Sequence, residues 1–184
     1  VREPVTEKVL LGPDLGQCCG GGATLFLEPL GWAATTVTVF GAGHVGQALV
    51  RVLDGTGVRV IWVDPRHESF PEALTAGVCA VTATDPVAEV TLAPRDSHVL
   101  IMTHSHDLDY AVLSAALRRG DFASVGLIGS DTKWARFRHR LARDGFSDET
   151  INSVICPIGI PGVGGKKPAE IAISVAARLL QGVG

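Results

Sequence analysis

The chain has 184 residues, of which 46% are hydrophobic and 19% are charged, and its formal net charge is −3. This composition supports a globular protein with a hydrophobic core and excludes an intrinsically disordered chain. The slightly acidic balance and the lack of a long apolar run exclude a general nucleic-acid binder and a membrane-spanning protein, so we expect neither nucleic acid nor membrane as a partner.

Residues 1–35 form a segment that differs in pattern from the rest of the chain, with the glycine-rich stretch GPDLGQCCGGG near its middle. We expect this segment to be the short N-terminal remnant of a second module, or a flap. Cys18 and Cys19 are adjacent, and their Cα atoms are about 3.8 Å apart across a trans peptide, whereas a relaxed disulfide prefers roughly 5.5–6 Å. Two free thiols are therefore expected. Four cysteines without a disulfide framework indicate a reducing, cytoplasmic location.

Glycine follows the cysteine pair at Gly20 and Gly21. Successive glycine N–H groups can form an anion-binding nest, which would favour the thiolate form of Cys18 or Cys19. A thiolate suits sulfur transfer or binding of a soft metal. The alternative is a tight turn in which the cysteines have no chemical role.

Residues 36–184 alternate short Val/Ile-rich runs with helical patterns, which predicts a parallel sheet covered by helices on both faces. The fold class is therefore a doubly wound, Rossmann-like α/β domain. We predict strands at 36–41, 58–64, 78–83, 97–104 and 124–129, and helices at 44–57, 68–77, 107–120, 131–145 and 167–181. Cys79, inside the third strand, is expected to be a packed core residue.

The stretch GAGHVG lies between the first predicted strand and the first predicted helix, and it has the G-x-G-x-x-G spacing through Gly41, Gly43 and Gly46. With Asp64 at the end of the next strand, it makes the full dinucleotide-binding fingerprint, in which the carboxylate binds ribose hydroxyls. His44, within the turn, belongs to the same candidate site. The alternative is a Rossmann turn that has lost its ligand. Asp64 disfavours a ligand with a 2′-phosphate, although Arg66 weakens that inference.

The stretch THSHDLDY follows the fourth predicted strand and places four polar side chains at the ligand-binding edge of the sheet: His104, His106, Asp107 and Asp109. Histidines followed by carboxylates can hold a metal or move protons. The alternative is that Asp107 caps the helix that begins near Leu108 and that both histidines are solvated.

The fourth long helical pattern begins at Ser130 or Asp131, either of which can cap it. Its basic residues recur at helical spacing and make one stripe, which contains Lys133, Arg136, Arg140 and Arg143. Lys133 and Arg136, near the helix start, are placed to bind a phosphate. A solvated charged face is the plainer interpretation of Arg140 and Arg143. A glycine-rich loop further on carries Lys166, which can close over an anionic ligand.

Together these motifs resemble the XdhC/CoxI family, the xanthine dehydrogenase accessory proteins. The resemblance runs from about residue 9 to the end of the chain, through GPDLGQCCGGG, FGAGHVGQAL, VDPR, THSHDLDYAVL, LIGSDTKWARFRHRL and CPIGIPGVGGKKPAEIAISVAARLL. It implies a protein that binds molybdenum cofactor (molybdopterin, Moco), protects it during sulfuration and passes it to apo-xanthine dehydrogenase or a related molybdoenzyme.

The resemblance also implies that Cys18 or Cys19 faces the molybdenum and that the turn from Gly41 to Gly46 holds a phosphate. A cysteine desulfurase would be a further partner, and a homodimer is the expected assembly. Such a protein is a chaperone rather than an enzyme. The alternative from the fingerprint alone is an NAD-dependent oxidoreductase, with His104 or His106 as the acid–base group, or a nucleotide-sensing domain.

Overall fold

A computed structural model describes residues 5–11, 21–27, 35–163 and 165–181 of the chain. The chain divides into two compact units, Val1–Trp32 and Ala33–Gly184. Cys18, Cys19 and Gly20 lie outside the described residues. The roles expected for these three residues therefore stay predictions.

The first unit contains an antiparallel hairpin of strands β1 (Val5–Leu11) and β2 (Gly21–Leu27). The register pairs Val5 with Leu27 and Leu11 with Gly21. Gly21, expected to contribute to an anion-binding nest, is therefore the first residue of a paired strand. Two-stranded hairpins are marginally stable on their own, and β2 exposes Leu25, Phe26 and Leu27.

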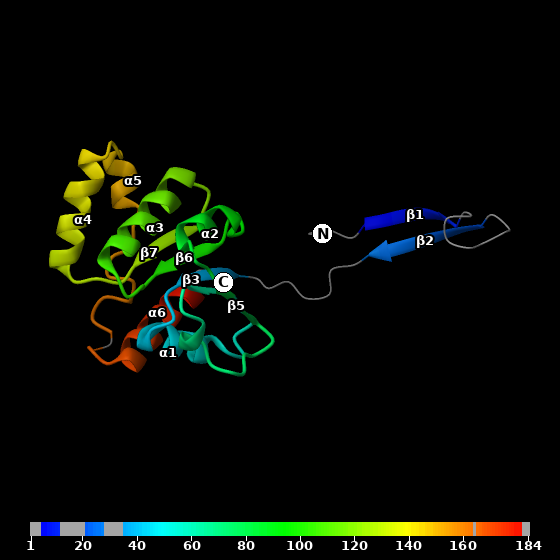
Figure 1. Ribbon diagram of the computed structural model, residues 1–184, viewed down its shortest axis with the longest axis horizontal. Helices are drawn as coiled ribbons and strands as arrows, with labels where there is room; N and C mark the ends of the chain where they lie inside the picture. Colours follow the sequence, from blue (N-terminus) through cyan, green and yellow to red (C-terminus); the bar gives the residue numbers. More distant parts are fainter. Residues whose placement is uncertain (1–4, 12–20, 28–34, 164, 182–184) are drawn as a thin grey trace. The chain divides into compact units, whose positions relative to one another are not determined.

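The second unit is built on a five-stranded parallel sheet (Figure 1). Its strands are β3 (Thr36–Phe40), β4 (Arg59–Asp64), β5 (Val78–Thr82), β6 (His98–Ile101) and β7 (Ser124–Leu127), in the spatial order β5-β4-β3-β6-β7. The expected Rossmann-like fold is thus confirmed. The chain runs outward from β3 to β5 and then returns to the other side of β3, so the topological switch point lies between β3 and β6. Open α/β sheets bind ligands in the crevice at such a point, beyond the carboxyl ends of the strands.

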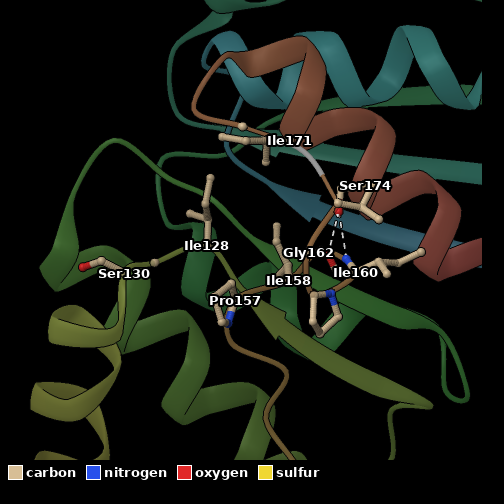
Figure 2. Close-up of a pocket in the computed structure, with 13 residues that line it drawn as sticks. Ile128, Ser130, Pro157, Ile158, Ile160, Gly162, Ile171 and Ser174 are labelled. Atoms are coloured by element: carbon tan, nitrogen blue, oxygen red, sulfur yellow. Dashed lines mark hydrogen bonds between the residues drawn. The ribbon is translucent and has the colours of Figure 1, made fainter.

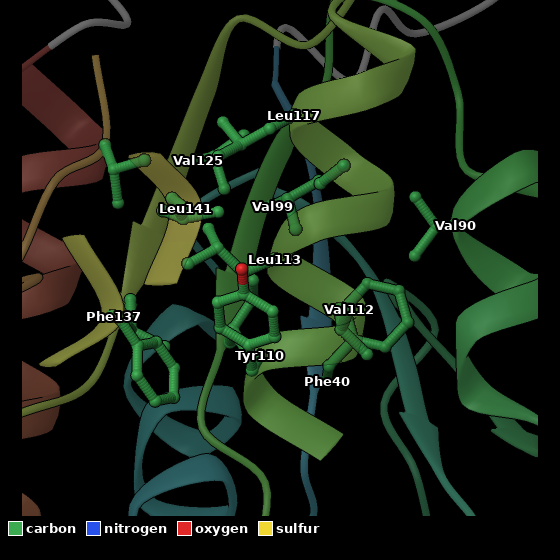
Figure 3. Packing of buried hydrophobic residues seen from close by; sticks show 14 of the residues in the cluster. Phe40, Val90, Val99, Tyr110, Val112, Leu113, Leu117, Val125, Phe137 and Leu141 are labelled. Carbon is green, nitrogen blue, oxygen red and sulfur yellow. The ribbon is translucent and has the colours of Figure 1, made fainter. Parts of the chain in front are cut away.

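Helices cover both faces of the sheet. Their bounds are α1 (His44–Leu53), α2 (Pro86–Leu92), α3 (His106–Arg119), α4 (Asp131–Arg143), α5 (Asp148–Asn152) and α6 (Pro168–Gln181). Buried residues of α1 and α6 share one hydrophobic core with Val37, Val39 and Trp62. Buried residues of α2, α3 and α4 share a second core with Phe40 and Val63 (Figure 3). Alternate side chains of β3 and β4 therefore point to opposite cores, as expected for strands buried on both faces.

The helix predicted at 68–77 is wrong. Only a short 3-10 helix, His67–Ser69, forms there, and the chain then continues without regular structure to β5. Pro71 explains the failure, because proline disfavours the helical conformation of the residue before it. That residue, Phe70, instead packs edge-on against the ring of Trp62, with 5.2 Å between the ring centroids.

Two short helices were not predicted, α2 and α5. Each begins with a side-chain cap that the sequence does display: Asp85 accepts hydrogen bonds from the N–H groups of Val87 and Ala88, and Ser147 accepts one from Thr150. Pro86 in the first turn of α2 is a further start signal. The helices are 7 and 5 residues long, which is too short for a clear hydrophobic period.

Cys79 lies in β5 as expected, but it is exposed, so its assignment to the core is wrong. The reason is the position of β5 at the edge of the sheet. The exposed side chains Cys79 and Thr82 show that this strand is covered incompletely. A strand pattern in the sequence does not reveal whether the strand is central or at an edge.

Candidate functional site

A tight glycine turn joins β3 to α1 at the switch point. Gly41 has a φ of +118°, a conformation that other residues rarely adopt, and a Cβ on it would overlap the carbonyl oxygen of Met102, at the end of β6. A Cβ on Gly46 would overlap the carbonyl oxygen of Gly41. A Cβ on Gly43 would meet no atom within 4 Å. Gly41 and Gly46 are thus required by packing, whereas Gly43 leaves open space above the turn.

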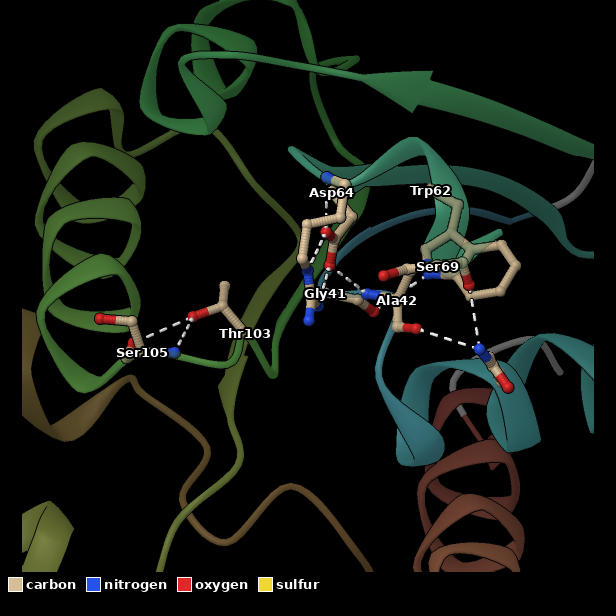
Figure 4. A network of polar contacts seen from close by, with 9 residues as sticks. Gly41, Ala42, Trp62, Asp64, Ser69, Thr103 and Ser105 are labelled. Atoms are coloured by element: carbon tan, nitrogen blue, oxygen red, sulfur yellow. Dashed lines mark hydrogen bonds and ion pairs between the residues drawn. The ribbon is translucent and has the colours of Figure 1, made fainter. Parts of the chain in front are cut away.

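Hydrogen bonds from neighbouring elements hold this turn in place (Figure 4). The N–H of Gly41 donates to the carbonyl oxygen of Val63 at 2.8 Å, and the indole N–H of the buried Trp62 donates to the carbonyl oxygen of Gly41 at 3.0 Å. Gln47 donates from its amide to the carbonyl oxygens of Ala42 (3.3 Å) and Ser69 (2.9 Å). The turn is therefore held in place by groups of the protein itself.

Asp64 completes the support of the turn. Its side chain is fully buried and accepts a hydrogen bond from the N–H of Ala42 at 2.7 Å. Arg66 donates to the same carboxylate from its backbone N–H, its Nε and its Nη2, each at 2.9 Å. Burial alone would raise the pKa of Asp64, but the hydrogen bonds from Arg66 and Ala42 outweigh burial and lower that pKa below its ordinary value of 3.8. The predicted ribose-binding carboxylate thus holds the glycine turn and Arg66.

The first turn of α1 carries no acidic residue, and Gly43 at its N-cap provides no side-chain hydrogen bond. Helices α2 to α5, in contrast, are each capped by a serine or aspartate side chain. The N-terminus of a helix has unsatisfied N–H groups and a partial positive charge. At α1 these groups face the open space above Gly43, and His44 is exposed beside them. This arrangement suits a phosphate.

The loop after β6 forms the other side of the switch point. His104, His106 and Asp107 are all exposed there. Ser105 caps α3 by accepting a hydrogen bond from Leu108, so the alternative in which Asp107 is the cap is wrong. Among residues 5–11, 21–27, 35–163 and 165–181, no three His, Cys, Asp or Glu side chains are grouped so as to hold a metal ion. Cofactor binding by His104, His106 and Asp107 stays a prediction.

A buried ion pair underlies this loop. Lys133 Nζ lies 2.5 Å from Asp109 Oδ2, and the two side chains are 10% and 1% exposed. Asp109 also accepts a hydrogen bond from the N–H of Thr103 (2.9 Å), and Lys133 donates to the carbonyl oxygen of Ile128 (2.7 Å). The ion pair thus connects the loops after β6 and β7 with the first turns of α3 and α4. Lys133, expected to bind a phosphate, has its ammonium group committed to these contacts.

Asp109 was expected only as one of the carboxylates that could hold a metal or move protons, and its burial beside Lys133 was not predicted. A signal was present, because Asp109 shares the helical spacing of Val112, Leu113 and Ala116, all of which are buried. An acidic residue on the buried face of a helix requires a cationic partner. Ser130, by contrast, was anticipated correctly as a cap: it accepts a hydrogen bond from the N–H of Lys133 at 3.3 Å.

A pocket of about 540 Å³ lies beyond the carboxyl end of β7 (Figure 2). Its lining is mostly apolar and includes Ile128, Pro157, Ile160, Val163 and Ile171. Ser174 of α6 anchors the loop that forms one wall, by accepting a hydrogen bond from the N–H of Ile160 at 2.8 Å. Lys166 is exposed just before α6, near the Gly165 end of this lining. The pocket follows the carboxyl end of β7 and the glycine turn follows that of β3, and because these strands are parallel both lie at one edge of the sheet.

No helix in the described part of the chain is both long and apolar enough to cross a membrane. The family model described as the XdhC Rossmann domain matches residues 37–179. The uncharacterized protein YqeB of Escherichia coli K12 is 30% identical over 171 residues, which are 91% of this chain and 30% of YqeB. The chain therefore spans less than a third of the length of that relative.

Two solved structures have similar folds. A xanthine dehydrogenase from Bacillus halodurans superimposes with a TM-score of 0.67 at 24% identity, over 87% of this chain and 44% of the other. The tRNA N6-threonylcarbamoyladenosine dehydratase of Escherichia coli superimposes with a TM-score of 0.59 at 14% identity, over 82% and 86% of the two chains. At these identities the likeness concerns the fold.

The contact between Gly46 and Gly41 predicts a loss of stability on substitution. Gly46→Ala places a methyl group against a backbone carbonyl that cannot move away, and we expect it to lower the free energy of unfolding by about 1–3 kcal/mol. Gly43→Ala is the matched control, because its methyl group enters open space, and we expect a change within about 0.5 kcal/mol. Urea denaturation measures both values, and equal losses would contradict the packing argument.

The ion pair beneath the loops predicts a larger effect. Lys133→Met leaves the buried charge of Asp109 without a partner, and we expect the free energy of unfolding to fall by about 3–5 kcal/mol. Arg136→Met, at an exposed position on the same helix, should change it by less than about 0.5 kcal/mol. Thermal and urea unfolding compare the two variants. Similar stabilities would show that Asp109 does not depend on Lys133.

Asp64 predicts a dependence of stability on pH. Because its pKa is lowered in the folded protein, its contribution to stability is complete above the ordinary value of 3.8 and is lost as the pH falls through the lower folded-state pKa. Asp64→Asn should therefore weaken the protein at pH 7 and reduce the loss of stability on acidification. Urea denaturation between pH 7 and pH 2 tests this. A wild-type-like slope in the variant would refute it.

Proposed function

The chain belongs to the XdhC family, and from that premise we propose that it is a cytoplasmic accessory protein that binds molybdenum cofactor. In this proposal the bound cofactor is cargo, delivered to apo-xanthine dehydrogenase or a related molybdenum hydroxylase. The observation that carries the proposal is the pairing of a preformed phosphate-type turn with an apolar pocket at the same edge of the sheet. A cysteine desulfurase as sulfur donor and a homodimeric assembly belong to the same proposal.

The described residues offer groups that match the parts of a phosphorylated pterin. The phosphate would lie over Gly43, where the N-terminus of α1 is uncapped and open. The ring system would lie toward the pocket of about 540 Å³, whose volume is within the usual range for small-molecule sites. Cys18 or Cys19 would supply the thiolate for the molybdenum end. Molybdenum cofactor brings its own redox chemistry, and the protein would bind, orient and shield it.

The two walls of this site are held rigidly, which suits a carrier of a fragile cargo. Four hydrogen bonds fix the turn: Asp64 accepts one from Ala42, and the other three are donated by Trp62, Gln47 and Gly41. Ser174 and Arg178 of α6 fix the wall of the pocket through Ile160 and Gly159. Binding to a prearranged site avoids the entropy of ordering loops. The alternative of an NAD-linked oxidoreductase has less support, because the carboxylate expected to bind the ribose is buried and fully used.

Retention of cofactor by the purified 184-residue chain tests the proposal. The protein is loaded with molybdenum cofactor, passed through a desalting column and assayed for pterin by fluorescence after oxidation. We expect stoichiometric retention by the wild type. Gly43→Ala should reduce retention at least tenfold, because its methyl group occupies the space of the phosphate. Gly77→Ala is the matched control, because it lies before β5, at the amino end of the sheet, with ordinary contacts.

A second pair of variants tests the pocket, and a third tests the thiols. Val163→Asp places a charge in the apolar lining and should lower retention, whereas Leu92→Asp, at a position 73% exposed on α2, should not. Cys18→Ala with Cys19→Ala should also lower retention. No retention by the wild type would refute the proposed function. Full retention by Gly43→Ala and Val163→Asp would place the cargo elsewhere on the protein.

A further inference from the structure

The carboxylate of Asp64 has no acceptor position left for a ligand. An ionised carboxylate offers about four lone-pair positions. In the structure four N–H groups fill them: one from Ala42 and three from Arg66. A ribose diol that approached Asp64 would have to displace Arg66, because the bond from Ala42 holds the glycine turn. Steric access is closed as well, since the Asp64 side chain is fully buried.

Arg66 lies over this carboxylate at the carboxyl end of β4, and its side chain is 37% exposed. A guanidinium group has five N–H donors in a planar fork. Within the described part of the chain, its side chain donates two hydrogen bonds, both to Asp64, through Nε and Nη2. These bonds fix the plane of the guanidinium group beside the glycine turn. The other N–H donors of this guanidinium group can reach a ligand, because the Arg66 side chain is partly exposed to solvent.

We propose that Arg66 determines which ligands the glycine turn accepts. It excludes ligands that would be held through a free ribose diol, and it favours ligands that present a phosphate monoester beside the turn. This inference rests on the proposed function, since it concerns the same turn and names the chemistry recognised there. The Nη1 hydrogens and the second Nη2 hydrogen of Arg66 are left for phosphate oxygens, and the uncapped N-terminus of α1 adds partial positive charge at the same turn.

The ion pair between Arg66 and Asp64 also contributes to recognition of the phosphate, because it holds the guanidinium group in one orientation. A lysine at the same position would keep the charge but lose the fork and the two parallel bonds. Arg66 is therefore expected to act by geometry as well as by charge. The phosphate monoester can be the terminal group of a pterin or the 2′-phosphate of a dinucleotide, and binding assays separate these two sources.

The probes for the experiment are NAD+ and NADP+, which differ only by the 2′-phosphate on the ribose. Calorimetry measures the dissociation constant of each for the wild type, Arg66→Ala and Arg66→Lys. We expect the wild type to bind NADP+ at least tenfold more tightly than NAD+. Arg66→Ala should bind NADP+ at least tenfold more weakly than the wild type and should bind NAD+ at least as tightly as NADP+. Arg66→Lys should lose most of the preference.

Arg51→Ala is the matched control, because Arg51 lies in the last turn of α1, away from the glycine turn, and donates to Gln47 of its own helix. It should keep the wild-type ratio of affinities. Equal affinities in the wild type, or an unchanged ratio in both Arg66 variants, would overturn the proposal. Absence of binding of either nucleotide to all the proteins would overturn it too, because removal of Arg66 must open the site to NAD+. Thermal unfolding checks that each variant is folded.

Retention of molybdenum cofactor, measured on the same proteins, separates this inference from the proposed function. A protein that discriminates between the nucleotides through Arg66 but retains no molybdenum cofactor would refute the proposed function alone. A protein that retains molybdenum cofactor equally with and without Arg66, and shows no shift in the nucleotide ratio, would refute the role of Arg66 alone.

Discussion

The site depends on one interaction, the hydrogen bond from the N–H of Ala42 to the buried carboxylate of Asp64. It connects the turn after β3 to the end of β4, and it exists only because Gly41 can pass within contact distance of Met102 at the end of β6. Three neighbouring strands thus converge on a turn in which Gly41 has no room for a side chain. Arg66 compensates the buried charge, since an unpaired carboxylate there would be strongly destabilising.

The same arrangement is repeated on the other side of the switch point. Asp109 is buried at the start of α3, holds the N–H of Thr103 after β6, and is neutralised by Lys133. In both places an aspartate fixes the backbone that follows a strand, and a basic residue pairs with its charge: Arg66 from the same loop in one case and Lys133 from α4 in the other. The two loops that border the crevice are therefore supported from below by paired charges, while Gly43 and His104 above them remain exposed.

The sequence predicted those features that depend on local spacing. The strand, the GAGHVG turn and the helix after it were placed correctly because glycine requirements and hydrophobic periods act within a few residues. The role of Asp64 was not predicted, because it depends on donors from Ala42 and Arg66 whose approach is decided by the packing of β3 against β4. The pocket was also not predicted: Ile128, Ile160 and Ser174 come from three distant segments. Local residues do indicate the remaining differences: Pro71 disfavours the helix predicted at 68–77, and Asp85 and Ser147 are the caps of α2 and α5.

The ion pairs of Asp64 and Asp109 affect how the protein responds to ionic strength. Charges inside a protein are screened by dissolved ions much less than charges in water, where the Debye length is about 8 Å at physiological salt. The supports at Asp64 and Asp109 are buried, whereas the N-terminus of α1 is open to solvent. A high salt concentration should accordingly weaken the binding of an anionic ligand at the N-terminus of α1, while the ion pairs of Asp64 and Asp109 stay intact. Under the proposed function, this difference would let the protein release its cargo without unfolding.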